Sequence, residues 1–209
     1  MAKDVSDSPM LELTLETAET VADNLLDSDV LKEIPVVGTA LKLCKAADNV
    51  RNRLFIAKLQ RFLLATNVDP DTKAKWRAKA SASPEEAAKI GESICLMLDR
   101  LADLTKAELI GTLFVAYTSD VIDHDKLQRL TQAIDVAFIA DIKMLLSKHK
   151  LPEDSTEPWM MHLVPSGLTQ ITGGKTLDSV GAIYCNATKL GHSLRNAYFH
   201  ARRLVDTAG

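Results

Sequence analysis

The sequence predicts a mainly α protein, with a helical bundle over residues 1–150 and a smaller unit built around one β-hairpin over residues 151–209. Apolar residues recur at helical spacing through most of the first 150 residues. The segment 151–158, which begins Leu-Pro-Glu-Asp and ends in Pro, interrupts that pattern. Beyond it, two short apolar runs flank Gly173-Gly174. With 209 residues and 46% hydrophobic content, the chain is long enough to bury a sizeable core.

Two helices are expected before residue 67. Residues 9–27 predict an amphipathic helix whose carboxylates share one face, because they recur at steps of four, three and four. These carboxylates are Glu12, Glu16, Glu19 and Asp23. Pro35 suits the first turn of a second helix, which runs to about Thr66 and becomes apolar on more than one face near its end. Such a helix must lie against protein or against a membrane.

The second of these helices carries the candidate binding surface. Residues 36–81 contain ten Lys and Arg against three Asp and Glu, whereas the flanking blocks are acidic. The basic residues expected to form the surface are Lys42, Lys45, Arg51, Arg53, Lys58 and Arg61. Three readings of this charge stay open: solvated helix faces, charge blocks that complement one another within the fold, or a surface for an acidic partner.

Three further helices are expected before residue 150, after a short basic helix that follows Pro70. Ser83, Pro84 and Glu86 predict a capping box, and Thr105 with Glu108 predicts another. A long helix is then expected over 124–148. Its predicted core residues are Leu127, Leu130, Ile134, Phe138, Ile142 and Leu145.

The C-terminal unit is expected to run helix, strand, turn, strand, helix. Its parts are a short helix over 159–164, strands over 168–171 and 180–185, a turn over 172–175, and a final helix capped by Asn186 or Thr188. This order is that of a small winged-helix-like unit. Gly167-Leu168, Tyr184, Thr188 and Gly191 also resemble the closing half of bacterial winged-helix domains, with Tyr and Thr one residue further apart than usual.

The rest of the chain resembles uncharacterised small bacterial helical proteins. The resemblance rests on the entrance Ile34-Pro35-Val36-Val37-Gly38 and on a helix ending in the run from Arg53 to Leu63, Arg-Leu-Phe-Ile-Ala-Lys-Leu-Gln-Arg-Phe-Leu. It implies a bacterial source and, by association alone, a role in stress response or phage defence. It carries over no activity and no site residues.

Nothing in the sequence matches a nucleotide or calcium loop. Gly173-Gly174-Lys175-Thr176 lacks the first glycine of a P-loop, since residue 169 is Thr, and we expect a hairpin turn there. Asp120, Asp123 and Asp125 lack the Gly and Glu that a calcium loop needs, which favours helix capping.

The residues that usually hold metals or act as nucleophiles are not spaced for that chemistry. His192 and His200 lie two turns apart, which is too far for one metal, and Cys44, Cys95 and Cys185 show no zinc spacing. No Gly-x-Ser-x-Gly elbow occurs. We therefore expect no cofactor, no metal and no enzymatic activity.

The predicted function is a non-enzymatic interaction or regulatory role in the cytoplasm, with a protein partner or self-association. The acidic start is not a secretory signal, and no apolar run is suited to span a membrane. The alternative is a peripheral membrane-surface or nucleic-acid-binding protein that acts through the basic helix 36–66. In that case helix 9–27 is expected to mask the basic surface, and the competing reading is a constitutive helical hairpin.

Overall fold

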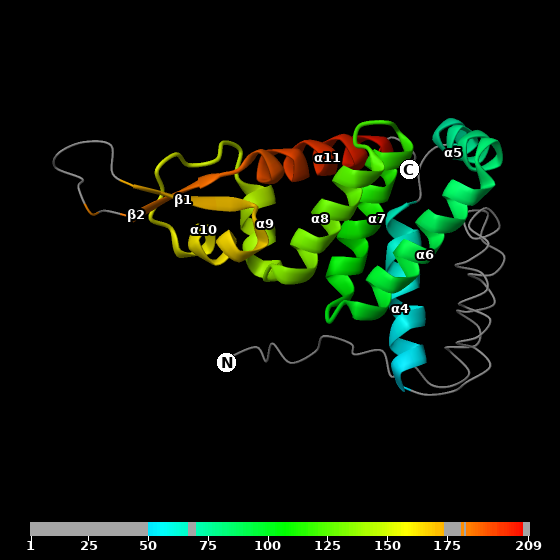
Figure 1. Cartoon of the computed structure of the whole chain (residues 1–209), viewed down its shortest axis with the longest axis horizontal. Helices are drawn as coiled ribbons and strands as arrows, with labels where there is room; N and C mark the ends of the chain where they lie inside the picture. The colour runs from blue at the N-terminus through cyan, green and yellow to red at the C-terminus, as the bar shows by residue number, and fades with distance from the viewer. Residues whose placement is uncertain (1–49, 67–69, 174–180, 182, 207–209) are drawn as a thin grey trace, which may run out of the picture.

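The computed structural model describes residues 50–66, 70–173, 181 and 183–206, and the described part is mainly helical. Helix labels follow Figure 1, so the first described helix is α4 (Val50–Ala65), followed by α5 (Pro70–Ala82) and α6 (Pro84–Arg100). Next come α7 (Leu104–Thr118), α8 (His124–Val136) and α9 (Ile139–Ser147). The predicted helix 9–27 and the start of the basic helix lie outside the described residues.

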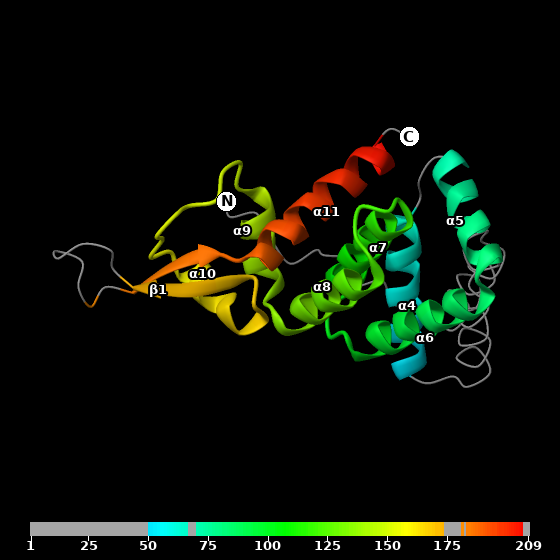
Figure 2. The ribbon, with the colours of Figure 1, turned by 45° about the horizontal axis from the view of Figure 1, so that its top comes forward.

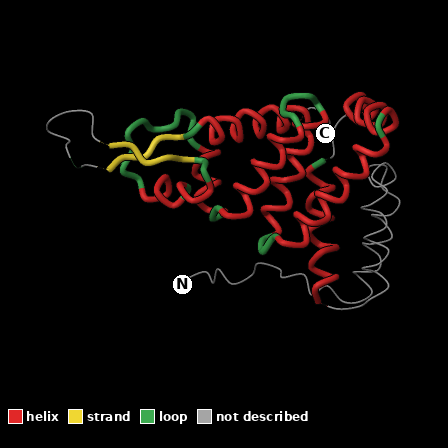
Figure 3. The backbone as a smooth tube through the Cα atoms, in the orientation of Figure 1, coloured by secondary structure: helices red, strands yellow, loops and turns green. Residues whose placement is uncertain are grey.

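The C-terminal part contains one small antiparallel hairpin, which follows two short helical segments and precedes a long helix, as Figure 3 shows. Its elements are α10 (Pro158–His162), the 3₁₀ turn η1 (Val164–Ser166), β1 (Thr169–Gly173), β2 (Ile183–Ala187) and α11 (Lys189–Asp206). The predicted mainly α fold with one β-hairpin is confirmed.

Helix α7 is the centre of the bundle. Every residue from Leu109 to Thr118 is buried, because the helix is apolar on all sides and other helices surround it. Helices α4, α8 and α11 all pack against α7. In Figures 1 and 2, α11 crosses one side of the bundle while the hairpin projects at the opposite end from α5.

Helices α4 and α7 approach closely at Gly111. A Cβ atom at this position would overlap the carbonyl oxygen of Phe62 and would lie 2.9 Å from the Cβ of Ala65. The rings of Phe62 and Phe114 meet beside this point at a centroid distance of 5.5 Å. The apolar end of the predicted basic helix is therefore buried against protein along one side.

The long helix predicted over 124–148 is interrupted. Ala137 and Phe138 have extended backbone, and the Phe138 carbonyl accepts from the N–H groups of Asp141 and Ile142, which starts α9. The break turns α9 toward α10 and α11, where Ile142 and Leu145 are fully buried. Phe138, which was predicted to be buried, is 71% exposed.

Two predicted caps also differ from the structure. Ser83 precedes α6, but its side chain makes no capping hydrogen bond, and Pro84 provides the start instead. Helix α7 begins one residue before Thr105, and the Asp103 carboxylate accepts from the Thr105 N–H at 2.6 Å. A carboxylate is the stronger acceptor at a helix N-terminus, so Asp103 forms the cap.

The hairpin is shifted relative to its predicted strands. Thr172 and Gly173, predicted as turn, belong to β1 and pair with Tyr184 and Ile183. The remaining predicted turn residues, 174 and 175, lie outside the described part. Asn186 is in β2, and Thr188 caps α11 by accepting from the Gly191 N–H at 3.1 Å.

The hydrophobic cluster includes residues from both sides of position 150. Phe62 and Leu113 belong to it together with Met160, Leu168 and Leu194. The division into units 1–150 and 151–209 remains a prediction, and contacts between α7 and α11 join the two parts.

Candidate interaction surfaces

Asp99 of α6 holds two of the predicted basic residues. The Arg51 guanidinium makes a two-pronged ion pair with the Asp99 carboxylate, with one N–O distance of 3.1 Å from Nε to Oδ1. The Lys58 ammonium donates to the Asp99 backbone carbonyl at 3.1 Å. Lys58 is buried, with 8% of its surface exposed. These two cations are thus used within the fold.

The surroundings lower the pKa values of both Lys58 and Asp99. Burial lowers the pKa of Lys58, while the Asp99 carboxylate acts in the other direction. The hydrogen bond from Arg51 lowers the pKa of Asp99. The lowered pKa of Asp99 favours its charged form. The contacts of Arg51 and Lys58 with Asp99 join α4 to α6.

Of the other four predicted basic residues, the structure describes two. Arg61 is exposed, whereas Arg53 is half-buried. Lys42 and Lys45 lie outside the described part of the chain. Among the four described residues of the predicted surface, Arg51 and Lys58 contact Asp99, and Arg61 is exposed.

One side of α4 nevertheless remains exposed and largely apolar. Val50, Leu54, Arg61 and Leu64 recur at steps that place them on one face of the helix. The three apolar residues are 70%, 50% and 62% exposed in chain order. We call these four residues the α4 face.

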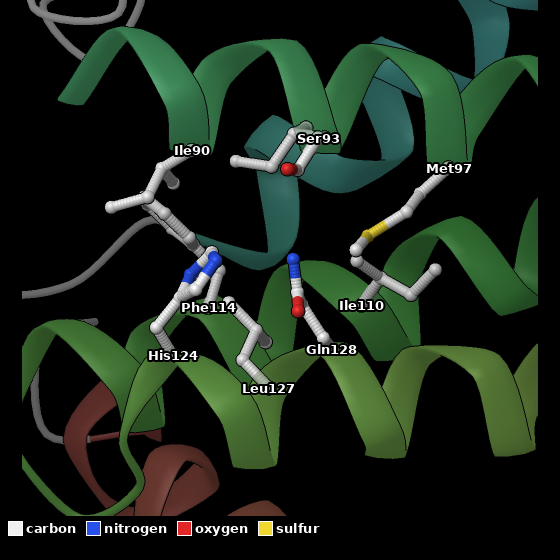
Figure 4. Close-up of a pocket in the computed structure, with 9 residues that line it drawn as sticks. Ile90, Ser93, Met97, Ile110, Phe114, His124, Leu127 and Gln128 are labelled. Atoms are coloured by element: carbon white, nitrogen blue, oxygen red, sulfur yellow. The ribbon is translucent and has the colours of Figure 1, made fainter. Parts of the chain in front are cut away.

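The cavity inside the bundle is too small for a ligand. It lies between α6 and α8 over α7, and its volume of about 10 Å³ is close to that of one water molecule. In Figure 4, Ser93 and Met97 approach from α6, while His124, Leu127 and Gln128 approach from α8. Nδ1 of His124 is buried with no hydrogen-bond partner in the described part of the chain.

The described residues that the sequence offered as possible metal ligands or nucleophiles have structural roles. The Asp123 carboxylate caps α8 by accepting from the Lys126 N–H at 2.7 Å. Burial raises the pKa of the Cys185 thiol, which disfavours a thiolate nucleophile. No group of three or more His, Cys, Asp or Glu residues suited to a metal occurs among residues 50–66, 70–173, 181 and 183–206.

A second apolar surface lies on the hairpin, which the sequence did not single out. Ile171 is opposite Cys185 in the register, and Ile183 lies two residues before Cys185, so the three share one face of the sheet. The Cys185 sulfur lies 3.9 Å from the Met161 sulfur, which places α10 over the same face. Met161, Ile171 and Ile183 are 40%, 55% and 59% exposed. We call these three residues the hairpin face.

Comparison with known proteins adds no assignment. No protein-family model, curated protein or solved structure matches this chain. Among the described helices, none has the length and apolar character that a membrane span needs.

Proposed function

We propose that the protein is a non-enzymatic interaction protein that contacts its partner through the outer edge of β1, beside the hairpin face of a winged-helix-like unit. The partner that the geometry fits is a second copy of the chain. The observation that carries the proposal is the outer edge of β1, which pairs with no described residue and lies beside the exposed hairpin face.

The order of elements supports the winged-helix-like description. Ser155 bridges to Cys185 through two backbone hydrogen bonds of 3.0 and 2.8 Å, and α10, β1, β2 and α11 follow. The Ser155 segment therefore pairs with the outer edge of β2 at Cys185. Winged-helix units often bind DNA, yet the described residues of 151–188 include no Lys or Arg to contact phosphates. An apolar contact with protein suits this surface better.

The outer edge of β1 is built for pairing with another strand. Cys185 uses its N–H and C=O on Ser155, so the pair Ile171–Cys185 is a non-hydrogen-bonded pair of the hairpin. The backbone groups of Ile171 therefore point away from β2. No described residue pairs with this edge of β1. An open edge with an exposed Ile is a template for another strand.

Two copies of β1 match each other around a two-fold axis at Ile171. Antiparallel pairing in this register sets Ile171 opposite its counterpart and Thr169 opposite Gly173 of the second copy. The result is a four-stranded sheet whose hairpin faces join into one apolar surface. In this isologous arrangement, both copies use the same surface to contact each other.

Sedimentation velocity over about 10 µM to 1 mM tests self-association, because a short strand interface is expected to be weak. We expect the mass to rise from the 22.9 kDa of one chain toward twice that value. Ile171→Glu is expected to stay monomeric. Gln170→Glu puts the same charge on the opposite, exposed face of β1 and is expected to associate like the parent. A parent protein that stays monomeric throughout would overturn the proposal.

A second candidate function uses the α4 face at an anionic membrane surface. Arg61 lies between Leu54 and Leu64 on one exposed helix face, and apolar area next to a cation favours anionic lipid. Nucleic-acid binding through the same helix has less support, because Arg51 and Lys58 are used on Asp99.

A further inference from the structure

A surface pocket lies between the loop after α9, the end of β2 and the first turns of α11. It has a volume of about 460 Å³, within the size range of small-molecule sites. The loop contributes residues 149–153, β2 contributes Asn186 and Ala187, and α11 contributes His192 and Arg195. None of these residues belongs to the hairpin face or the α4 face.

Basic side chains dominate the polar lining of this pocket. His149 and Lys150 approach from the loop, and His192 and Arg195 approach from α11. Glu153 is the one carboxylate among the lining residues, and it is exposed. With both imidazoles counted as neutral, the lining still carries a net positive charge.

Arg195 is held in place before any ligand arrives. Its guanidinium donates to the backbone carbonyl of Leu145, to that of Lys148 at 2.6 Å and to that of His149 at 3.3 Å. The guanidinium carbon lies 5.2 Å from the centre of the Phe199 ring. A side chain fixed in this way loses little conformational entropy when a ligand binds.

Among the described residues, no carboxylate forms an ion pair with Arg195. Every hydrogen-bond acceptor that Arg195 contacts in the described part of the chain is a neutral carbonyl oxygen. Burial lowers the pKa of Arg195, which reflects the cost of placing the cation there. An anion in the pocket would reduce that cost, and Lys150 and the two imidazoles add donors around the same space.

We propose that this pocket binds a small phosphorylated molecule through its phosphate group. A phosphate carries close to two negative charges and three acceptor oxygens, so it can accept from the loop and from α11 together. A carboxylate has one charge and two oxygens and satisfies fewer of these donors.

Titration of the full chain with inorganic phosphate, followed by backbone amide NMR shifts, tests the site. We expect saturable shifts at Leu151, Glu153, Ala187 and His192 at phosphate concentrations up to about 20 mM. Acetate at equal ionic strength is expected to bind more weakly. Lys150→Gln is expected to weaken phosphate binding about fivefold, the effect of losing one exposed charge contact.

Lys143→Gln is the matched control, because Lys143 is an exposed lysine on α9 that does not line the pocket. It is expected to bind phosphate like the parent. Circular dichroism confirms that both variants are folded. Shifts that do not saturate, or an equal loss of binding in both variants, would overturn the site. Equal binding of acetate and phosphate would overturn the choice of phosphate.

Discussion

At the level of single residues, Asp99 determines how the basic side of α4 is arranged. Its carboxylate pairs with Arg51, and its backbone carbonyl accepts from the buried Lys58 ammonium. The sequence showed the excess of cations on this helix. It did not show Asp99, because that residue lies 41 positions after Lys58 and only the packing of α4 on α6 brings them together.

The stabilising effect of the Asp99 carboxylate should depend on pH. Arg51 lowers its pKa in the folded protein, so the carboxylate stabilises the fold above its unfolded pKa of about 4, and this contribution is lost as pH falls through the folded pKa. Because the pair is exposed, we expect Asp99→Asn to reduce the free energy of unfolding by at most about 1 kcal/mol at pH 7. Urea unfolding at several pH values measures it.

The control for this experiment is Glu92→Gln, which removes an exposed carboxylate from the same helix. Its effect is expected to be smaller than that of Asp99→Asn at pH 7. The difference between the parent and Asp99→Asn is expected to shrink at low pH. A difference that is the same at pH 7 and below the folded pKa of Asp99 would contradict this account.

Cys185 should be chemically inert in the folded protein. It is 1% exposed, and burial raises the pKa of its thiol, so little thiolate is present at neutral pH. In a Cys44→Ser, Cys95→Ser variant, a disulfide reagent is expected to label Cys185 only after urea unfolds the chain. Rapid labelling of the native variant would show that the thiol is accessible.

At the level of elements, α4 and α7 pack so closely at Gly111 that there is no room between them for a side chain at this position. A methyl group there would overlap the Phe62 carbonyl oxygen, and backbone cannot move aside as a flexible side chain can. We expect Gly111→Ala to lower the free energy of unfolding by about 1–3 kcal/mol, despite the better helix propensity of Ala. Thermal and urea unfolding measure the change.

Gly173→Ala is the matched control for Gly111→Ala. An added Cβ at Gly173 has no neighbour within 4 Å, so the change is expected to be close to neutral. If Gly111→Ala is as stable as Gly173→Ala, then α4 and α7 are not packed as closely as the structure has them.

Helix positions could be predicted from the sequence, but the break between α8 and α9 could not. Ile134, Phe138 and Ile142 follow each other at steps of four and predict one apolar stripe. The structure buries Ile134 and Ile142 on two differently directed helices and leaves Phe138 exposed between them. The reason is tertiary: α9 gains contacts with α10 and α11, which spacing along one helix does not reveal.

The candidate surfaces also depend on contacts between elements that are far apart in the sequence. Arg61 is exposed, whereas Lys58 is buried and donates to a backbone carbonyl of α6. The hairpin face depends on strand register: Ile171 and Ile183 face the same side only because Ile171 lies opposite Cys185. The predicted ends of the two strands differ from the observed ends by one to three residues. Such a shift hides which residues share a face.

At the level of the whole molecule, the two exposed apolar surfaces lie on different elements. The hairpin projects from one end, and α4 lies in the bundle toward the other end (Figure 1). We propose that residues 9–27 mask the α4 face, because their carboxylates complement the basic helix. This proposal rests on the sequence, since these residues lie outside the described part of the chain.

Deletion of residues 1–28 tests the masking. We expect the shortened protein to float with anionic vesicles and not with neutral ones, and high salt should weaken the binding, since each nearby cation contributes about 1 kcal/mol. Adding Leu54→Glu and Leu64→Glu to the deletion is expected to abolish flotation. A folded deletion variant that does not bind anionic vesicles would contradict the masking. The competing reading, a constitutive helical hairpin, would then be favoured.

The central claim, that two copies pair through the open edge of β1, is tested most directly at the Ile171 amide. Hydrogen exchange followed by NMR is expected to show protection of this N–H that increases with protein concentration, because pairing gives it an acceptor in the second copy. The Gln170 amide faces β2 within the hairpin and should be protected at every concentration. Rapid exchange at Ile171 that is independent of concentration, with Gln170 protected, would contradict the account.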